Sequence, residues 1–109
     1  MKIEYADTKI KKLCSNPTKF GRSDYSKKIL TELEDALIII SNMQNCKEFY
    51  LPIHRCYKFE RLVNKGGLMS IRLDKKFRLT FIDIENDEKK EFINITGIII
   101  KEVSNHYGD

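Results

Sequence analysis

Residues 68–81 read LMSIRLDKKFRLTF and give the clearest structural signal in the second half of the chain. Apolar and polar side chains alternate on both sides of a polar centre, which is typical of β-strands with one buried face. The central tripeptide Asp74-Lys75-Lys76 favours a turn of three residues. The segment therefore predicts a hairpin whose strands are residues 68–73 and 77–84.

The period of two seen in this hairpin extends over most of the second half of the chain. Residues 53–62 and 91–103 predict two further strands, and Lys65-Gly66-Gly67 and the acidic stretch 85–88 predict turns between strands. We therefore expect an antiparallel meander in which consecutive strands are neighbours. Gly97 interrupts the alternation, which favours a bulge or bend in the last strand.

Helical spacing is confined to the first half of the chain. Residues 2–6 alternate and predict a short strand, and Asp7 follows as a cap for a short helix that ends at Asn16-Pro17. A longer helix is expected from a cap at Ser23 or Asp24 to about residue 42. Its apolar residues at helical spacing are Ile29, Leu33, Leu37 and Ile40.

These elements predict an α+β fold with two N-terminal helices packed on one face of a twisted antiparallel sheet. The chain has 109 residues, of which 41% are apolar and 33% charged. This length and composition fit one soluble domain over residues 1–109 and exclude a membrane protein.

Basic residues are concentrated in one part of the sequence. Residues 55–78 contain eight Lys or Arg and two acidic residues, a local charge of +6, whereas the whole chain carries +4. Such an excess attracts phosphate groups, although a solvated basic face that aids solubility is the alternative.

Three cysteines, Cys14, Cys46 and Cys56, form no CxxC pair, and the N-terminus lacks the apolar stretch of a signal peptide. A reduced cytoplasm is the expected location. His54 and Cys56, with Cys46, are the one spacing typical of zinc, but a second close ligand pair is missing. We therefore expect no metal and no other cofactor, and interpret the cysteines as buried structural thiols.

The predicted hairpin brings two arginines together. If its apolar residues face the helices, Arg72 and Arg78 share the open face, and a three-residue turn places them directly opposite each other. A like-charge pair at such a position destabilises a sheet, and a phosphate held between the two guanidinium groups would relieve the repulsion. The alternative is that both side chains extend into solvent or pair with Asp83 or Glu102.

His106 and Tyr107, near the C-terminal end, are a second candidate for chemistry. The unperturbed pKa of histidine, about 6.5, suits acid or base catalysis near neutral pH, and tyrosine can position a proton or stack on a base. A terminal histidine without a catalytic role is the alternative.

Tyr57, Lys58 and Arg61 fall in the strand predicted at residues 53–62 and would border the face that carries the two arginines. Aromatic and basic side chains interleaved on a sheet are typical of single-strand nucleic-acid binding. Core or edge packing of Tyr57 and Phe59 is the alternative. No Walker loop, GxGxxG or HExxH motif indicates another chemistry.

The segments GLMSIRL at 67–73, FRLTF at 77–81 and EVSNHY at 102–107 follow one another at a characteristic spacing. Their order resembles the SIR(I/V) strand, the aromatic-Arg-(I/L)-x-F strand and the closing acidic-tyrosine-histidine strand of the RelE/ParE superfamily of bacterial toxins. The resemblance is greatest to the HigB-like branch and spans nearly the whole chain.

This resemblance implies a toxin that cuts messenger RNA in the ribosomal A site and is held inactive by a cognate antitoxin. The antitoxin would be a HigA-like protein with a helix-turn-helix domain, and no membrane would be involved. Arg72 and Arg78 fall where family members contact the scissile phosphate. The basic residues expected to bind RNA around them are Lys58, Arg61, Lys65, Lys75 and Lys76.

Two departures from the family pattern affect the acid and base. The closing Asp-Tyr-His is here Asn105-His106-Tyr107, and the family histidine before the glycine turn corresponds to Tyr57. We therefore expect His106 or Tyr107 to act as base or acid, with Tyr57 stacking or assisting proton transfer. A ParE-like gyrase poison that acts by protein binding and an inactive toxin-derived binding module are the alternatives.

Overall fold

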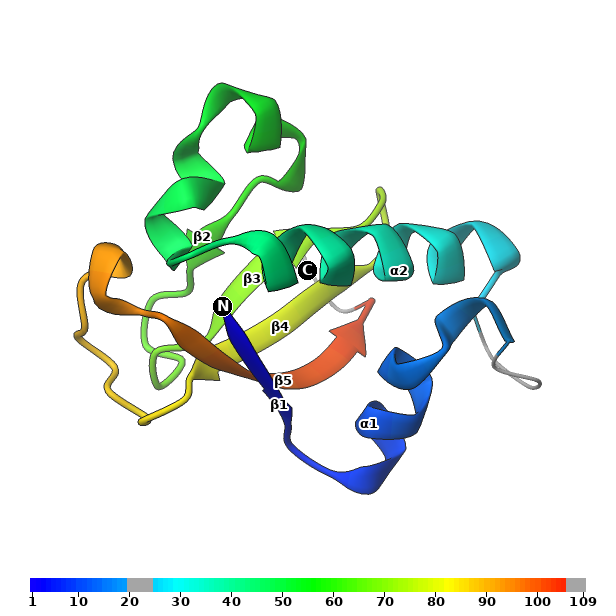
Figure 1. Cartoon of the computed structure of the whole chain (residues 1–109), viewed down its shortest axis with the longest axis horizontal. Helices are drawn as coiled ribbons and strands as arrows, with labels where there is room; N and C mark the ends of the chain where they lie inside the picture. The colour runs from blue at the N-terminus through cyan, green and yellow to red at the C-terminus, as the bar shows by residue number, and fades with distance from the viewer. Residues whose placement is uncertain (20–24, 106–109) are drawn as a thin grey trace.

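In the computed structural model, which describes residues 1–19 and 25–105, five strands form one sheet in the order β1-β5-β4-β3-β2 (Figure 1). The strands are β1 (Lys2–Tyr5), β2 (Glu60–Arg61), β3 (Met69–Arg72), β4 (Arg78–Asp83) and β5 (Gly97–Ser104). The pairs β2–β3, β3–β4 and β4–β5 are antiparallel, whereas β1 runs parallel to β5. The α+β class is confirmed, but the sheet is mixed rather than purely antiparallel, because the long connection after β1 allows a parallel edge.

The first helix, α1 (Thr8–Ser15), begins where the sequence predicts. The Asp7 carboxylate accepts a hydrogen bond of 2.8 Å from the Ile10 amide, which satisfies one of the unpaired donors of the first turn. Ile10 and Leu13 are buried, so the short amphipathic face of this helix joins the core.

The long helix, α2 (Lys27–Asn42), lies across one face of the sheet (Figure 1). Its cap is Ser26, whose Oγ accepts from the Ile29 amide at 3.2 Å, so the predicted cap at Ser23 or Asp24 is wrong; both of those residues lie outside the described ranges. Leu33 and Ile40 are fully buried on the face predicted to be apolar. They belong to the same hydrophobic core as the sheet residues Ile71, Leu79, Phe81 and Ile100.

The strand predicted at residues 53–62 is largely wrong. The 3-10 helix η3 (Pro52–Tyr57), which follows the 3-10 helix η2 (Cys46–Tyr50), occupies the first half of this range, and only the two residues of β2 pair with β3. Pro52 at the start of η3 supplies a φ suited to a helical turn, and Lys58 ends it in a left-handed conformation with φ of 47°. Ile53, the first residue of the predicted strand, is 77% exposed.

The last predicted strand begins later than expected, because η4 (Phe92–Asn94) precedes β5. The irregularity expected at Gly97 lies instead opposite the Thr80/Phe81 step of β4, where Thr80 pairs with Glu102 and Phe81 with Ile100. Lys101 is the extra residue, and it shifts the alternation of β5 by one. As a result Ile100 and Val103 are both buried although they are three residues apart.

The predicted turn at Lys65-Gly66-Gly67 is confirmed, and Gly67 is its most constrained position. Gly67 has φ of 79°, and a Cβ there would lie 2.8 Å from the Glu88 Cα. We expect Gly67→Ala to lower the free energy of unfolding by about 1–3 kcal/mol in urea denaturation, because strain and a backbone clash combine. Gly66→Ala is the matched control, since Gly66 shares the positive φ without the clash. Equal losses for the two variants would contradict the role of the Glu88 contact.

The cysteines divide into two buried thiols and one exposed thiol, so the prediction of three buried thiols is wrong for Cys56. Burial raises the pKa of Cys14 and of Cys46 to about 12. At pH 8 only about one in ten thousand of these groups is ionised. We expect iodoacetamide to label Cys56 in the native protein and all three cysteines only after unfolding, as counted by mass spectrometry. Labelling of Cys14 or Cys46 at the rate of Cys56 would contradict this expectation.

Candidate functional site

The turn between β3 and β4 sets the register that brings the two arginines together. The Asp74 carboxylate accepts hydrogen bonds of 2.7 Å from the amides of Lys76 and Phe77, and the Leu73 amide donates to the Phe77 carbonyl at 2.9 Å. Asp74 therefore closes a turn of three residues, as the sequence predicts. Arg72 is paired directly with Arg78 across the two strands.

Both arginines lie on the sheet face opposite α2. The alternating residues Ile71 and Leu79 are fully buried in the core, so their neighbours Arg72 and Arg78 project from the other face. Ser70 and Thr80 share that face and are also buried, as small hydroxyl side chains between longer neighbours. The register and the shared face expected for the arginine pair are both confirmed.

Arg78 is held by neighbouring groups along the sheet. Its Nε donates to Ser70 Oγ at 3.0 Å, its Nη2 donates to the Lys58 carbonyl at 2.9 Å, and the same Nη2 lies 3.9 Å from Glu60 Oε1. Only 15% of its side chain is exposed. These contacts orient the guanidinium before any ligand arrives, which reduces the entropy lost on binding.

Arg72 has more of its donors available. Its Nε donates to the Asp74 carbonyl at 3.1 Å, and its terminal nitrogens make no hydrogen bond with any residue of ranges 1–19 and 25–105. A guanidinium with two unused terminal nitrogens can bind phosphate oxygens as a fork. The site therefore combines one fixed guanidinium with one that has free donors.

The acids proposed as alternative partners of the arginines are placed differently. Asp83 is 3% exposed, lies on the helix side of β4 and pairs with Lys90 Nζ at 3.1 Å. Glu102 lies on the arginine face opposite Thr80 but is exposed. Arg78 lies instead within ion-pair distance of Glu60, which no sequence pattern indicated as its partner.

Two of the predicted site residues, Tyr57 and Arg61, lie on the helix side of the sheet rather than on the face of Arg72 and Arg78. Tyr57 ends η3, and its ring packs edge-on against Phe49 with centroids 6.5 Å apart. Burial raises the pKa of the Tyr57 hydroxyl, and the charges of Cys56 and of Asp35 and Glu32 on α2 add to this effect. Tyr57 therefore faces α2, because the helical turns of η3 replace the expected strand.

Arg61 is the second predicted site residue that lies on the helix side of the sheet. It pairs with Met69 in the sheet, which directs it to the helix side. Its Cζ lies 4.5 Å from the centre of the Phe92 ring, and its Nη2 donates to the Lys90 carbonyl at 2.7 Å. These contacts anchor the segment before β5 and hold Arg61 away from the arginine pair, so the expectation that it borders the face of Arg72 and Arg78 is wrong.

The other basic residues predicted to bind RNA are exposed but divided between places. Lys75 and Lys76 lie in the turn beside Arg72, whereas Lys65 lies in the turn at the opposite end of β3. Lys58 adjoins Arg78 through its carbonyl, and this contact depends on a left-handed residue that has no sequence signature. The structure thus brings Lys58, Lys75 and Lys76 near the arginine pair and separates Lys65 from it.

β5 ends beside the arginine pair, because Ser104 is paired with Arg78. His106 and Tyr107 follow Ser104 by two and three residues in the sequence and lie outside the described residues.

Within residues 1–19 and 25–105, no three His, Cys, Asp or Glu side chains gather as metal ligands. Across the same ranges, no helix combines the length and apolar character that crossing a membrane requires. No protein-family model, curated protein or solved structure matches this chain.

Proposed function

We propose that this protein is the toxin of a toxin–antitoxin pair and acts as a ribosome-dependent endoribonuclease in the cytoplasm. The observation that carries the proposal is the pairing of Arg72 with Arg78 on the sheet face opposite α2. Two guanidinium groups at directly opposite positions form a site for one phosphate, which the RNA backbone supplies. The HigB-like order of the sequence segments supports RNA rather than a small phosphate ester.

The proposed reaction needs no group beyond side chains and the RNA itself. The 2′-oxygen attacks the adjacent phosphorus while a base accepts the proton of the 2′-hydroxyl. The bond from phosphorus to the 5′-oxygen then breaks, an acid protonates that oxygen, and a 2′,3′-cyclic phosphate remains. Arg72 and Arg78 stabilise the charge that develops on the phosphate oxygens.

Proton transfer is assigned to His106 or Tyr107. Both follow the end of β5, the strand that pairs with Arg78 through Ser104. Tyr57 has no part in the proposed reaction, since its ring packs on the helix side of the sheet. The partner that restrains the toxin is proposed to be an antitoxin with a helix-turn-helix domain.

Induction of the chain in cells, followed by mapping of transcript ends, tests the proposed function. We expect new 5′ ends inside translated messages, and their disappearance from a reporter message whose start codon has been removed. Intact transcripts together with DNA damage signalling would instead identify a gyrase poison. Intact transcripts without damage signalling would identify an inactive binding module, and either result would overturn the nuclease assignment.

A further inference from the structure

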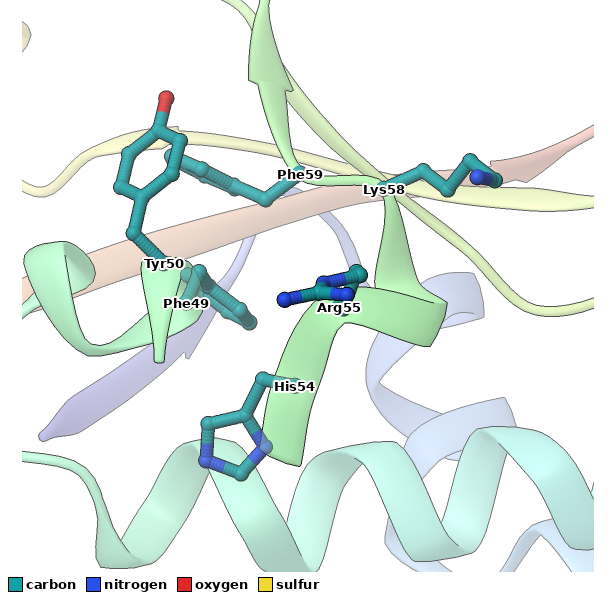
Figure 2. A pocket seen from close by; sticks show the side chains of 6 residues that line it. All are labelled: Phe49, Tyr50, His54, Arg55, Lys58 and Phe59. Carbon is teal, nitrogen blue, oxygen red and sulfur yellow. The ribbon is translucent and has the colours of Figure 1, made fainter. Parts of the chain in front are cut away.

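A pocket of about 310 Å³ opens at the β2 edge of the sheet, between η2, η3 and the chain that enters β2. This volume is at the lower end of the range for small-molecule sites, about 300–1,000 Å³. Its lining residues are Phe49, Tyr50, His54, Arg55, Lys58 and Phe59 (Figure 2). Neither arginine of the candidate site lines this pocket.

Aromatic rings form the rigid part of the pocket. Phe49 and Phe59 are stacked with centroids 4.6 Å apart and planes 12° from parallel, and both are buried. Tyr50 meets Phe59 edge-on at 5.5 Å and is 58% exposed. A flat ligand can therefore contact an accessible ring that is itself fixed by the core.

The remaining lining residues give the pocket a positive charge. Arg55 and Lys58 are exposed, no acidic residue lines the pocket, and neither side chain makes an ion pair within the described ranges. Figure 2 shows the Arg55 guanidinium pointing across the opening toward Phe49, whereas the Lys58 side chain points away from the rings. A ligand with a flat ring and a negatively charged group is complementary to this arrangement.

The pocket is joined to the arginine pair through one residue. Lys58 lines the pocket, and its carbonyl accepts the hydrogen bond from Arg78 Nη2 at 2.9 Å. A single nucleotide would fill only the pocket, but a strand with one phosphate per nucleotide would reach both places. An acidic peptide would satisfy the cations but would leave the flat aromatic wall without a matching group.

We infer that this pocket binds one base of a single-stranded RNA, with its phosphate at Arg55 and a neighbouring phosphate at Arg78. The inference takes its ligand from the proposed function and adds a subsite that selects the nucleotide beside the cut. Sequence selection would then depend on Tyr50 and Arg55, which lie outside the arginine pair.

Fluorescence polarisation with a labelled hexanucleotide tests this inference. The oligonucleotide is fully 2′-O-methylated, so it binds without being cleaved. We expect Tyr50→Ala and Arg55→Ala each to weaken binding about tenfold, the effect typical of a lost stacking partner or phosphate contact. Ile53→Ala is the matched control, because Ile53 is 77% exposed on η3 and does not line the pocket. Thermal unfolding checks that each variant is folded.

Lys58→Gly separates the two roles of the shared residue. Glycine retains the carbonyl and accepts the positive φ, so the Arg78 contact survives while the ammonium is lost. We expect weaker oligonucleotide binding, since one cation beside the pocket is removed, and unchanged thermal stability. Wild-type affinity in Lys58→Gly would overturn a role for this ammonium in holding the strand.

The possible binding results distinguish a failure of the proposed subsite from a failure of the proposed nuclease activity. Wild-type affinity in both Tyr50→Ala and Arg55→Ala would overturn the subsite and leave cleavage at the arginines untouched. Tighter binding of hexaglutamate than of the oligonucleotide would overturn it in favour of a peptide site. Equal affinity for adenosine monophosphate and for the hexanucleotide would overturn the strand assignment in favour of free nucleotides. Oligonucleotide binding that depends on Tyr50, in a chain that cuts no transcript in cells, would support the subsite and overturn only the nuclease.

Discussion

Arg78→Ala is expected to lower the rate of RNA cleavage by about 10²–10³-fold, the loss typical of a removed stabiliser of transition-state charge. The guanidinium of Arg78 is oriented by Ser70 and by the Lys58 carbonyl, so alanine removes a charge that is already in position. The same loss is expected for Arg72→Ala, because in the wild type the unused terminal nitrogens of Arg72 would bind the phosphate directly. Cleavage of a defined message on programmed ribosomes measures both rates.

Two further variants distinguish catalysis from folding. Lys9→Ala removes one exposed positive charge from α1, which carries none of the residues predicted to bind RNA, so we expect less than a threefold change in rate. Arg78→Lys retains the charge but not the planar fork, so an intermediate rate is expected. Wild-type cleavage by folded Arg78→Ala protein would reject the proposed role of this residue.

Asp83→Ala is expected to lower the free energy of unfolding by about 3 kcal/mol, because charge-assisted hydrogen bonds in a buried setting are lost. Asp83 Oδ2 accepts from the amides of Glu85 and Asp87 at 3.1 Å each and pairs with Lys90 Nζ at the same distance. The carboxylate is 3% exposed, so water does not replace these partners in the folded protein. Urea denaturation monitored by circular dichroism measures the loss.

Asp83→Asn is the conservative control for this prediction. The amide oxygen can still accept from the two backbone donors, so a smaller loss than for alanine is expected. Equal stability of Asp83→Ala and wild type would show that the loop after β4 does not depend on this carboxylate.

The same cluster predicts how stability depends on pH. Hydrogen bonds to Glu85 and Asp83 raise the pKa of Lys90 above its ordinary value of 10.5. A cation with a raised folded-state pKa stabilises the protein fully below its unfolded pKa and loses this effect as pH rises through the folded value. Lys90 is protonated in both the folded and the unfolded state from pH 6 to 9, so the difference in unfolding free energy between wild type and Lys90→Met should be constant over this range. The difference should shrink above about pH 10.5. A difference that grows with rising pH would contradict the assignment.

The hairpin was predictable because its signals are local. Alternation over residues 68–81 assigns the faces, and Asp74 forms a turn with its own neighbours, so no distant contact is needed to pair Arg72 with Arg78. The cap at Asp7 was predictable for the same reason. The cap at Ser26 was missed by two or three positions because several polar residues precede α2 and each can serve as a cap.

The segment around Tyr57 was not predictable from periodicity. Residues 53–59 alternate like a strand, but Pro52 starts η3 and Phe49 and Phe59 stack on each other across the intervening turns. The stack joins residues ten positions apart, which no short-range pattern reports. This packing places Tyr57 on the helix side and creates the pocket beside Lys58.

The α+β class, the hairpin register and the common face of Arg72 and Arg78 follow from local sequence patterns, because alternation and turn chemistry act between near neighbours. Three other features arise only when the whole chain folds: the parallel edge at β1, the burial of Asp83 with Lys90 and the aromatic pocket joined to Arg78 through Lys58. These features depend on which distant segments pack together, and packing energy is shared over the whole core rather than encoded in any one stretch.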